Sequence, residues 1–305
     1  MRITVLGGCG FIGSAIVAEM LSDGHQVTVF DYKNVNKQNI SVFLDKINFV
    51  GGDFLNPEEL SPAIQNAEIV FHLASTTLPG SSLKSPTYDI ETNVVSSIHL
   101  MEKCLSLNVR KLVFISSGGT VYGVPEQIPI KESNSLNPIT PYGLSKLTIE
   151  KYLAFYKYHY GLDYSVVRLS NPYGSKQNPH SGQGVIASWV HKIRHNESIE
   201  MWGDGEVVRD YIYIDDAVKA MKAIAFSSTD HQVFNVGSGV GHSLNQLHKI
   251  IEECLGQKIN VSYKPTRKVD VPVNILDTSL ILDSLGWQAT TSLREGIIKT
   301  WQALN

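Results

Sequence analysis

The sequence has few cysteines, little net charge and no long apolar run, and each of these absences excludes a class of protein. Cys9, Cys104 and Cys254 form no CxxC pair and have no histidine spacing that suits zinc, so we expect no metal site and a reducing, cytoplasmic setting. The 26 Lys and Arg against 29 Asp and Glu give a net charge of −3, which argues against nucleic acid as a partner. No stretch reaches the roughly 18 apolar residues of a membrane-spanning helix, and the N-terminus lacks a charged leader and a cleavage site. We therefore expect a soluble protein with no membrane partner.

Short apolar runs rich in β-forming residues alternate with amphipathic segments through the first half of the chain. The expected strands cover residues 3–6, 27–30, 47–50, 69–72, 112–116 and 164–169. The expected helices cover residues 12–22, 57–65, 87–107 and 141–160. This alternation is typical of parallel βαβ units, so it predicts an α/β fold with a Rossmann-type doubly wound parallel sheet.

The pattern changes after residue 170, where prolines and glycines break the chain into loops and short elements. A chain of 305 residues is long enough for a large α/β domain and a second lobe. We predict a first domain over residues 1–170 and a smaller C-terminal lobe over residues 171–305, some segments of which return to the first domain.

A glycine-rich segment, GGCGFIG at 7–13, follows the first expected strand and opens the first expected helix. Without side chains at Gly7, Gly10 and Gly13, backbone N–H groups can approach a pyrophosphate at the helix N-terminus, although a plain tight turn uses the same residues. Asp31 ends the second strand, where its carboxylate can bind both hydroxyls of an adenosine ribose and would repel a 2′-phosphate. This pattern predicts a site for NAD rather than NADP, and Lys33 nearby weakens the preference.

Asp53, in GGDF after the third expected strand, has two interpretations. Its carboxylate can accept a hydrogen bond from the adenine amino group, with the backbone of Phe54 beside it. It can equally cap the following helix, because Asn56 and Pro57 come next.

Tyr142 and Lys146 stand four residues apart on an expected helix and so share one face. A phenol with an ordinary pKa of about 10 is a poor base at neutral pH, but a neighbouring ammonium favours the phenolate. The pair therefore suits acid–base chemistry, although an exposed Tyr and Lys at helical spacing also occur by chance.

Motifs along nearly the whole chain share the pattern of one enzyme family. They are GGCGFIG at 7–13, Asp31, Asp53, HLAS at 72–75, Asn93, SSGGTVYG at 116–123, Tyr142 with Lys146, RLSNPYG at 168–174, WGDG at 202–205, VRDYIYIDD at 208–216 and TRKVDVP at 266–272. Together they resemble the extended short-chain dehydrogenase/reductases, within the NAD-dependent nucleotide-sugar epimerase and dehydratase group that includes UDP-glucose 4-epimerases. The resemblance implies NAD as the cofactor, a nucleotide-diphosphate sugar as the substrate, and a C-terminal lobe that binds it.

The resemblance also implies a role for each matching residue. Tyr142 would be the acid and base, and Lys146 would bind the nicotinamide ribose and hold the phenolate, with Thr120 or Ser117 as a hydroxyl relay. The implied cofactor contacts are Gly7, Gly10, Phe11, Ile12, Gly13, Asp31, Asp53, Phe54, Leu73, Ala74, Ser75, Asn93, Ser116, Tyr142 and Lys146. The implied substrate contacts are Thr77, Thr120, Asn171, Val185, Arg209, Arg267, Asp270 and Asn274.

The sequence departs from the family pattern beside the catalytic tyrosine. The family usually has Ser or Thr where this chain has Gly118, so Thr120, Ser117 or a water molecule would have to replace that hydroxyl. Gly119 and Thr120 stand where sugar dehydratases carry an Asp-Glu pair, so elimination of water has no obvious catalyst. Thr77 replaces a lysine common in hexose 4-epimerases, and Asn274 replaces a bulky tyrosine, which leaves room for an acetamido group.

These features predict an NAD-dependent 4-epimerase of a nucleotide-diphosphate hexose, of the UDP-glucose/UDP-galactose type and with or without an N-acetyl group, acting through a transient 4-keto sugar. The alternatives are a reductase of a dTDP-type 4-keto-6-deoxy sugar that consumes NAD(P)H and, less favoured, a non-catalytic NAD sensor. The resemblance further implies a homodimer, formed by the helices around residues 93–104 and 142–156 as a four-helix bundle.

Overall fold

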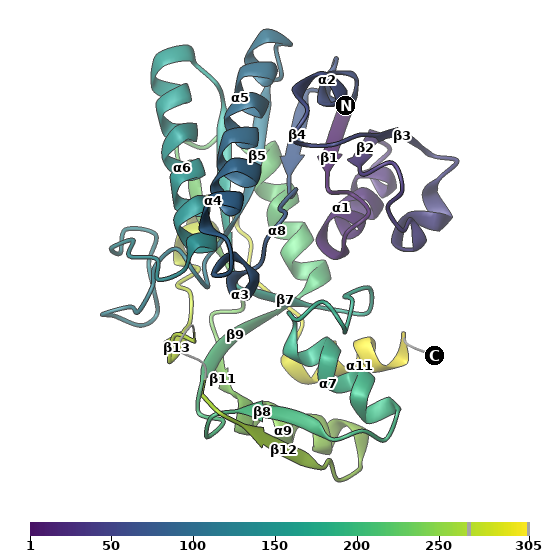
Figure 1. The fold of residues 1–305 in the computed structure, drawn as a ribbon, viewed down its shortest axis with the longest axis vertical. Helices are drawn as coiled ribbons and strands as arrows, with labels where there is room; N and C mark the ends of the chain where they lie inside the picture. The colour runs from purple at the N-terminus through teal and green to yellow at the C-terminus, as the bar shows by residue number, and fades with distance from the viewer. Residues whose placement is uncertain (267–269, 304–305) are drawn as a thin grey trace.

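A seven-stranded parallel sheet organises the upper part of the molecule in a computed structural model that describes residues 1–266 and 270–303 (Figure 1). Its strand order is β10-β6-β5-β4-β1-β2-β3. The strands are β1 (Arg2–Leu6), β2 (Gln26–Asp31), β3 (Ile47–Gly51), β4 (Ile69–His72), β5 (Lys111–Ser117), β6 (Tyr164–Leu169) and β10 (Val233–Val236). The predicted doubly wound α/β fold is confirmed, and each of the six predicted strands agrees within one residue at either end.

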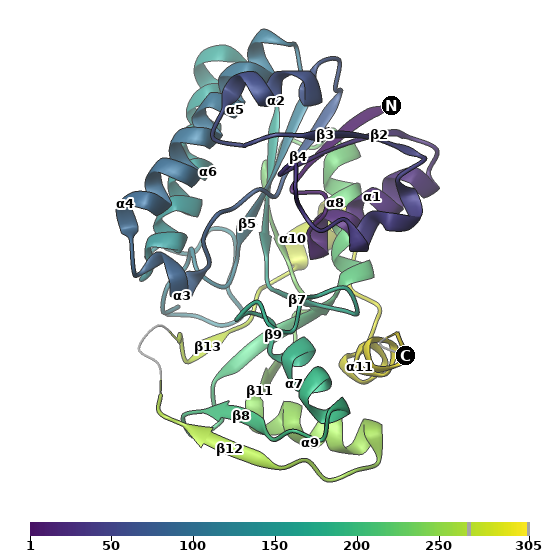
Figure 2. The same cartoon turned by 45° about the vertical axis from the view of Figure 1, so that its right-hand side comes forward.

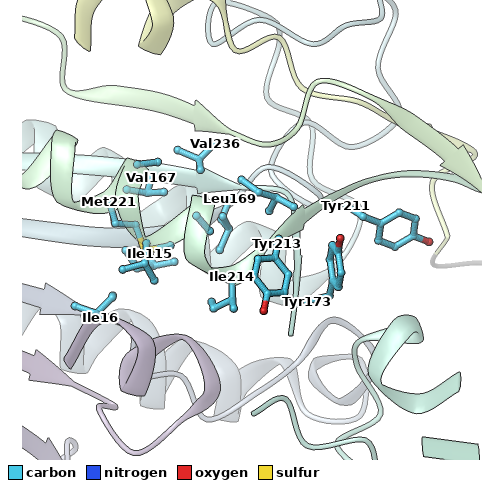
Figure 3. Close-up of a cluster of buried hydrophobic side chains, with 14 of the residues drawn as sticks. Ile16, Ile115, Val167, Leu169, Tyr173, Tyr211, Tyr213, Ile214, Met221 and Val236 are labelled. Carbon is cyan, nitrogen blue, oxygen red and sulfur yellow. The ribbon is translucent and has the colours of Figure 1, made fainter. Parts of the chain in front are cut away.

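Helices cover both faces of this sheet, which is why strands such as β4 and β6 are buried at every position (Figure 2). One face carries α1 (Phe11–Ser22) and α8 (Ile214–Phe226), and the other carries α2 (Pro57–Ile64), α5 (Ser96–Ser106) and α6 (Pro141–Tyr160). In the core between α1, α8 and the sheet, Ile16 and Met221 pack towards Ile115 and Val167 (Figure 3). Burial of this apolar surface on both sides fixes the sheet as a rigid base for the loops at its edge.

The predicted helix over residues 87–107 is continuous but not uniform. It consists of α4 (Pro86–Asp89), a π-helical turn η2 (Ile90–Val95) and α5. A π-helical turn shifts the side-chain register within a helix and is common at functional sites. Here it lies in the part of the helix that is in contact with α6.

The chain after residue 170 forms most of the lower lobe in Figure 1. Its strands are β7 (Asn171–Tyr173), β9 (Val208–Tyr213), β11 (Gly241–Ser243) and β13 (Val273–Asn274) in one sheet, and β8 (Ile199–Trp202) with β12 (Val261–Lys264) in another. Its helices are α7 (Val185–Arg194), α9 (Leu244–Leu255) and α11 (Leu293–Gln302). The later segments α8, β10 and α10 (Ser279–Leu285) lie against the large sheet, with β10 paired to β6.

Two short elements complete the fold, η1 (Gln38–Phe43) after β2 and α3 (Pro79–Ser82) after β4. Within residues 1–266 and 270–303, no helix has both the length and the apolar character needed to cross a bilayer. The order of the large sheet reverses at β1, which pairs with β2 on one side and β4 on the other. In doubly wound sheets the crevice beyond the carboxyl ends of the strands at this reversal is where ligands bind.

Candidate active site

The glycine-rich turn joins β1 to α1 at the point where the strand order reverses. Gly7 has a φ of +81°, which favours glycine, and a Cβ at Gly13 would collide with the carbonyl oxygen of Gly7. The N-cap of α1 is Gly10, and no side chain in the described chain caps it. The helix therefore presents its first N–H groups, those of Phe11, Ile12 and Gly13, without a protein acceptor on a side chain, which suits the pyrophosphate of a dinucleotide.

Asp31 lies beside this turn, as its predicted contact with a ribose requires. Its Oδ2 accepts a hydrogen bond from the backbone N–H of Cys9 at 3.0 Å, and its Oδ1 accepts one from Tyr32 at 2.9 Å. The ammonium of Lys33 lies 3.3 Å from Glu59 Oε2 instead. Because that cation already has a carboxylate partner, it gives little support to binding of a 2′-phosphate, and the acidic position decides in favour of NAD.

Asp53 does not cap α2. The cap is Asn56, whose side chain accepts from the N–H of Glu58, while Asp53 Oδ1 accepts from Leu55 at 3.0 Å. The capping alternative is therefore wrong, and the proposed contact with adenine stays a prediction. The ring of Phe54 is buried against His72, at 5.0 Å between ring centroids, so only its backbone could meet a ligand.

The segment after β4 brings the next predicted cofactor residues to the same edge of the sheet. Leu73 continues β4 by donating to Leu6 O at 3.1 Å, Ala74 lies against Gly7, and Ser75 Oγ donates to Thr77 O. Asn93 of η2 fixes this segment, because its Oδ1 accepts from the N–H of Thr76 at 3.0 Å. The side chain of Asn93 therefore holds the loop after β4 in place.

Tyr142 and Lys146 lie on the first turns of α6, beside the end of β5. The Nζ of Lys146 lies 5.5 Å from the centre of the Tyr142 ring and donates to Ile115 O at 2.9 Å. Lys146 is only 6% exposed, whereas Tyr142 is half-buried and can be reached by a ligand. The predicted pairing on one helix face is therefore present.

The protonation of this pair differs from the sequence-based expectation. Burial, followed by the charge of Asp89, raises the pKa of Tyr142 to about 12, and burial lowers the pKa of Lys146 to about 8. The lysine alone therefore does not make the phenol acidic. Burial raises the pKa of the phenol more than one nearby ammonium can lower it, and burial also disfavours the charged form of that ammonium.

Asp89, which the sequence analysis did not single out, is fully buried next to this pair. Its carboxylate accepts hydrogen bonds from the hydroxyls of Ser145 and Thr77, and from the amide of Asn93 at 3.3 Å. No ion pair joins it to a cation within residues 1–266 and 270–303. The single sequence carries no signal for this residue, since nothing in PTYDIETN distinguishes it from a surface acid.

Gly118 is a glycine for a packing reason. A Cβ there would lie 2.6 Å from Leu276 Cδ1 and 3.1 Å from Arg168 O, so Leu276 fills the space of the usual Ser or Thr side chain. The expectation that water could fill this space is wrong. Thr120 Oγ1 is buried and has no partner in the described chain, whereas the hydroxyl of Ser116 donates to Glu150. Thr120 is therefore better placed than Ser116 to bond a substrate, with Ser117 half-buried at the end of β5.

The predicted substrate residues come from several elements of the lower lobe. Arg209 of β9 lies 3.6 Å from Asp270 and donates to Val271 O at 2.5 Å. Asn171 donates to Asp210 O at 3.0 Å, and Val185 begins α7. Asn274, paired with Arg209 in the sheet, donates to Gly118 O at 3.0 Å and so contacts the segment that follows β5. Arg267 lies outside the described residues.

Two of these substrate assignments are constrained by existing bonds. The hydroxyl of Thr77 donates to Asp89, so its proton is not available to a diphosphate while that bond stands. The side-chain N–H of Asn274 donates to the carbonyl oxygen of Gly118. Its Oδ1 is buried and accepts no hydrogen bond from the described residues. An N–H or O–H of the substrate could donate to that oxygen.

The fold and the site together define a dinucleotide-dependent enzyme with a tyrosine–lysine pair. Residues 3–237 match the model of the NAD dependent epimerase/dehydratase family, and the chain belongs to this family. NAD is the cofactor of the enzyme, and the arrangement of the glycine turn and Asp31 fits it.

Curated relatives and solved structures narrow the comparison. The chain is 36% identical to UDP-glucose 4-epimerase from Mycolicibacterium smegmatis, over 98% of this chain and 97% of the relative. It is 32% identical to a dTDP-4-dehydro-6-deoxyglucose reductase from Escherichia coli, over 97% and 95% of the two chains. A crystal structure of UDP-glucose 4-epimerase with UDP-glucose from Thermotoga maritima superposes with a TM-score of 0.94 at 37% identity, covering 100% of this chain and 98% of that one. The chain is thus an enzyme of the nucleotide-sugar epimerase and dehydratase type.

Proposed function

We propose that the protein is an NAD-dependent 4-epimerase of a nucleotide-diphosphate hexose of the UDP-glucose/UDP-galactose type. The observation that carries this proposal is the half-buried phenol of Tyr142, with the ammonium of Lys146 5.5 Å from its ring, at the edge of the sheet where the glycine turn also lies. The similarity to UDP-glucose 4-epimerases over nearly the whole chain supports the same reaction.

In this proposal Tyr142 takes the proton from the O4 hydroxyl of the sugar and later returns it. NAD, which the glycine turn and Asp31 would hold, would supply reversible hydride transfer and a positive charge at the site. That charge is what the phenol requires, because burial keeps its pKa near 12 in the protein alone. Thr120, whose hydroxyl lacks a partner in the described chain, would hold the sugar hydroxyl next to Tyr142.

The lower lobe would hold the nucleotide while the sugar rotates. The guanidinium of Arg209, which lies 3.6 Å from Asp270, would bring positive charge to a diphosphate. Binding through groups that do not react leaves the 4-keto sugar free to rotate without leaving the site. Arg267 and Asn171 would complete these anchors, and the acceptor oxygen of Asn274 would meet a sugar hydroxyl or an acetamido N–H.

The test is conversion without reductant. Purified protein is incubated with UDP-glucose, UDP-galactose and their N-acetylated counterparts, with dTDP-glucose and GDP-mannose as controls for the base, and the products are separated by chromatography. We expect a mixture of C4 epimers of a UDP sugar, with no net change in NADH absorbance. Absence of any epimer in all reactions would reject the proposal.

A reductase of a dTDP-4-keto-6-deoxy sugar is the second candidate, favoured by the 32% identity to the E. coli reductase and by Gly118 in place of the usual hydroxyl. A parallel incubation with NAD(P)H and a dTDP-4-keto-6-deoxy sugar decides between the two, because a reductase consumes one NAD(P)H for each 4-keto sugar it reduces. Oxidation of NAD(P)H only with a 4-keto substrate, together with no epimerisation, would establish this candidate instead.

We also propose a cytoplasmic homodimer that pairs α5 and α6 with their copies. Large apolar side chains are exposed on α6 and on the turn before α5, among them Leu144, Phe155 and Val95 at 53%, 44% and 41%. Light scattering after gel filtration should give twice the monomer mass. Phe155→Glu should halve that mass, whereas Tyr158→Glu, at a residue 85% exposed on the same helix, should not.

A further inference from the structure

The buried acid Asp89 has no part in the reaction described above, yet its position is costly. A carboxylate that is 0% exposed and bonded to hydroxyl and amide donors, with no cation in contact among the described residues, is normally avoided in a protein interior. Buried ionisable groups of this kind are concentrated at functional sites. The bonds of Asp89 indicate what it does.

Each oxygen of the Asp89 carboxylate is bonded to a different segment of the site. One accepts from Ser145, which lies on α6 between Tyr142 and Lys146. The other accepts from Thr77, in the loop after β4, and from Asn93 of η2. The first turn of α6 is therefore attached to the loop whose other residues are predicted to meet the cofactor. A second bond, from the Tyr142 N–H to Ser82 Oγ at 3.1 Å, attaches the same turn to α3.

The charge of Asp89 is also one of the charges that act on Lys146. The ionisable groups that face Lys146 are Asp89 from α4, Glu150 and Tyr142 from α6, and His72 from β4. Glu150 is already paired with Arg168 at 2.7 Å, and burial lowers the pKa of His72 to about 3, so this imidazole is neutral. Asp89 is then the anion near Lys146 that lacks a cation of its own.

We propose that Asp89 is a positioning residue for the Tyr142–Lys146 pair: its buried carboxylate anchors the turn of α6 that carries the pair, and its negative charge acts on the ammonium of Lys146. Since Asp89 is fully buried, its role is to act through Ser145 and through Coulomb attraction across the buried site. The role rests on the proposed function only for its effect on turnover, because the charge of Lys146 can be measured without any substrate.

The test measures the titration of Lys146 directly in protein saturated with NAD. Protein labelled with ¹³C-lysine gives a Cε resonance for each lysine, and the one that is absent from Lys146→Met belongs to Lys146. In Asp89→Asn the midpoint of this resonance should move to lower pH by about half a unit or more, because the nearby anion is gone. The control is Glu91→Gln, which removes an exposed charge two residues away and should leave the midpoint unchanged. An unchanged midpoint in Asp89→Asn overturns the proposal.

Turnover separates the anchoring from the charge. With the UDP-hexose substrate, Asp89→Asn should lower kcat by about 10- to 100-fold with little change in KM, since the reacting groups lose their alignment while the nucleotide contacts remain. Ser145→Ala keeps the carboxylate and removes the bond to α6, so kcat should fall while the Lys146 midpoint stays in place. If Asp89→Asn does not fold, this second variant decides, and a normal kcat in Ser145→Ala overturns the anchoring role. If the wild-type protein epimerises no sugar, the proposed function fails, and the Lys146 midpoints still test Asp89.

Discussion

The two ends of the active site are built in different ways. At the adenosine end, the carboxylate of Asp31 bonds backbone N–H groups of Cys9 and Tyr32, and the cation of Lys33 pairs with Glu59 near solvent. At the catalytic end, Lys146 and Asp89 are buried, and burial moves the pKa of Tyr142 and of Lys146 far from their ordinary values. Recognition of a fixed ligand needs a correct backbone shape, whereas proton transfer needs charges held away from water.

This difference has a consequence for stability. Buried charges cost folding free energy, and backbone bonds at a glycine turn do not. The catalytic end should therefore be the place where replacement of a residue changes both activity and stability, and the adenosine end the place where it changes cofactor affinity. The four predictions that follow test this contrast, beginning with the largest effect.

Tyr142→Phe should lower turnover by about 10²- to 10⁴-fold, the usual contribution of an acid–base group, because the ring remains and only the proton carrier is lost. NAD should stay bound in the stoichiometry of the wild-type protein, as measured by cofactor release after denaturation. Tyr158→Phe, on an exposed part of α6, is the control and should be fully active. Normal turnover of the Tyr142 variant would remove the basis of the proposed mechanism.

Lys146→Met should change how stability depends on pH. The folded pKa of Lys146 is about 8, below the ordinary value of 10.5, so the folded protein binds fewer protons than the unfolded chain between these values. Keeping this lysine charged inside the protein therefore costs up to roughly 3 kcal/mol below pH 8, and the cost disappears as pH rises towards 10.5.

Urea unfolding at several pH values measures this dependence. The free energy of unfolding of Lys146→Met minus that of the wild type should decrease as pH rises from about 8 to 10.5. A difference that is constant with pH would mean that Lys146 titrates like an exposed lysine, and the contrast between the two ends would lose its electrostatic basis.

Asp31→Ala should weaken NAD binding by about 10- to 100-fold, the value of hydrogen bonds to one charged group, and should narrow the preference for NAD over NADP. Calorimetry on protein freed of cofactor gives both dissociation constants. Asp23→Ala removes an acid that pairs with Lys222 away from the site and serves as the control. Retention of wild-type affinity by the Asp31 variant would contradict the ribose assignment.

The smallest effect is expected for Lys33→Ala. Its side chain is 66% exposed and its ammonium lies 3.3 Å from Glu59, a surface pair that contributes little to stability or binding. The ratio of NAD to NADP affinity should change by less than about twofold. A large loss of NADP affinity would show that Lys33 leaves Glu59 to meet a 2′-phosphate, and it would place a functional charge at the adenosine end after all.

The contrast between the ends also explains what could be predicted. The glycine turn and Asp31 are close in sequence or follow a strand directly, so a motif is enough to place them. The Tyr142–Lys146 pair lies on one helix and was equally accessible to a spacing argument. A spacing argument could not find Asp89, Ser145 or Leu276. These residues reach the site from α4, from inside α6 and from the C-terminal lobe, so whether they meet depends on how these elements pack.

The sequence by itself determined the order of strands and helices, because period-two and helical patterns are local. It also determined the cofactor class, because the predicted phosphate and ribose contacts lie in short motifs. The tertiary structure alone decided the protonation of the catalytic pair. A pKa depends on how much water is excluded and on which charges come near, and both follow from contacts between segments as far apart as residues 89 and 145. The tertiary structure also explains the glycine at position 118, because the side chain of Leu276 fills the space beside it.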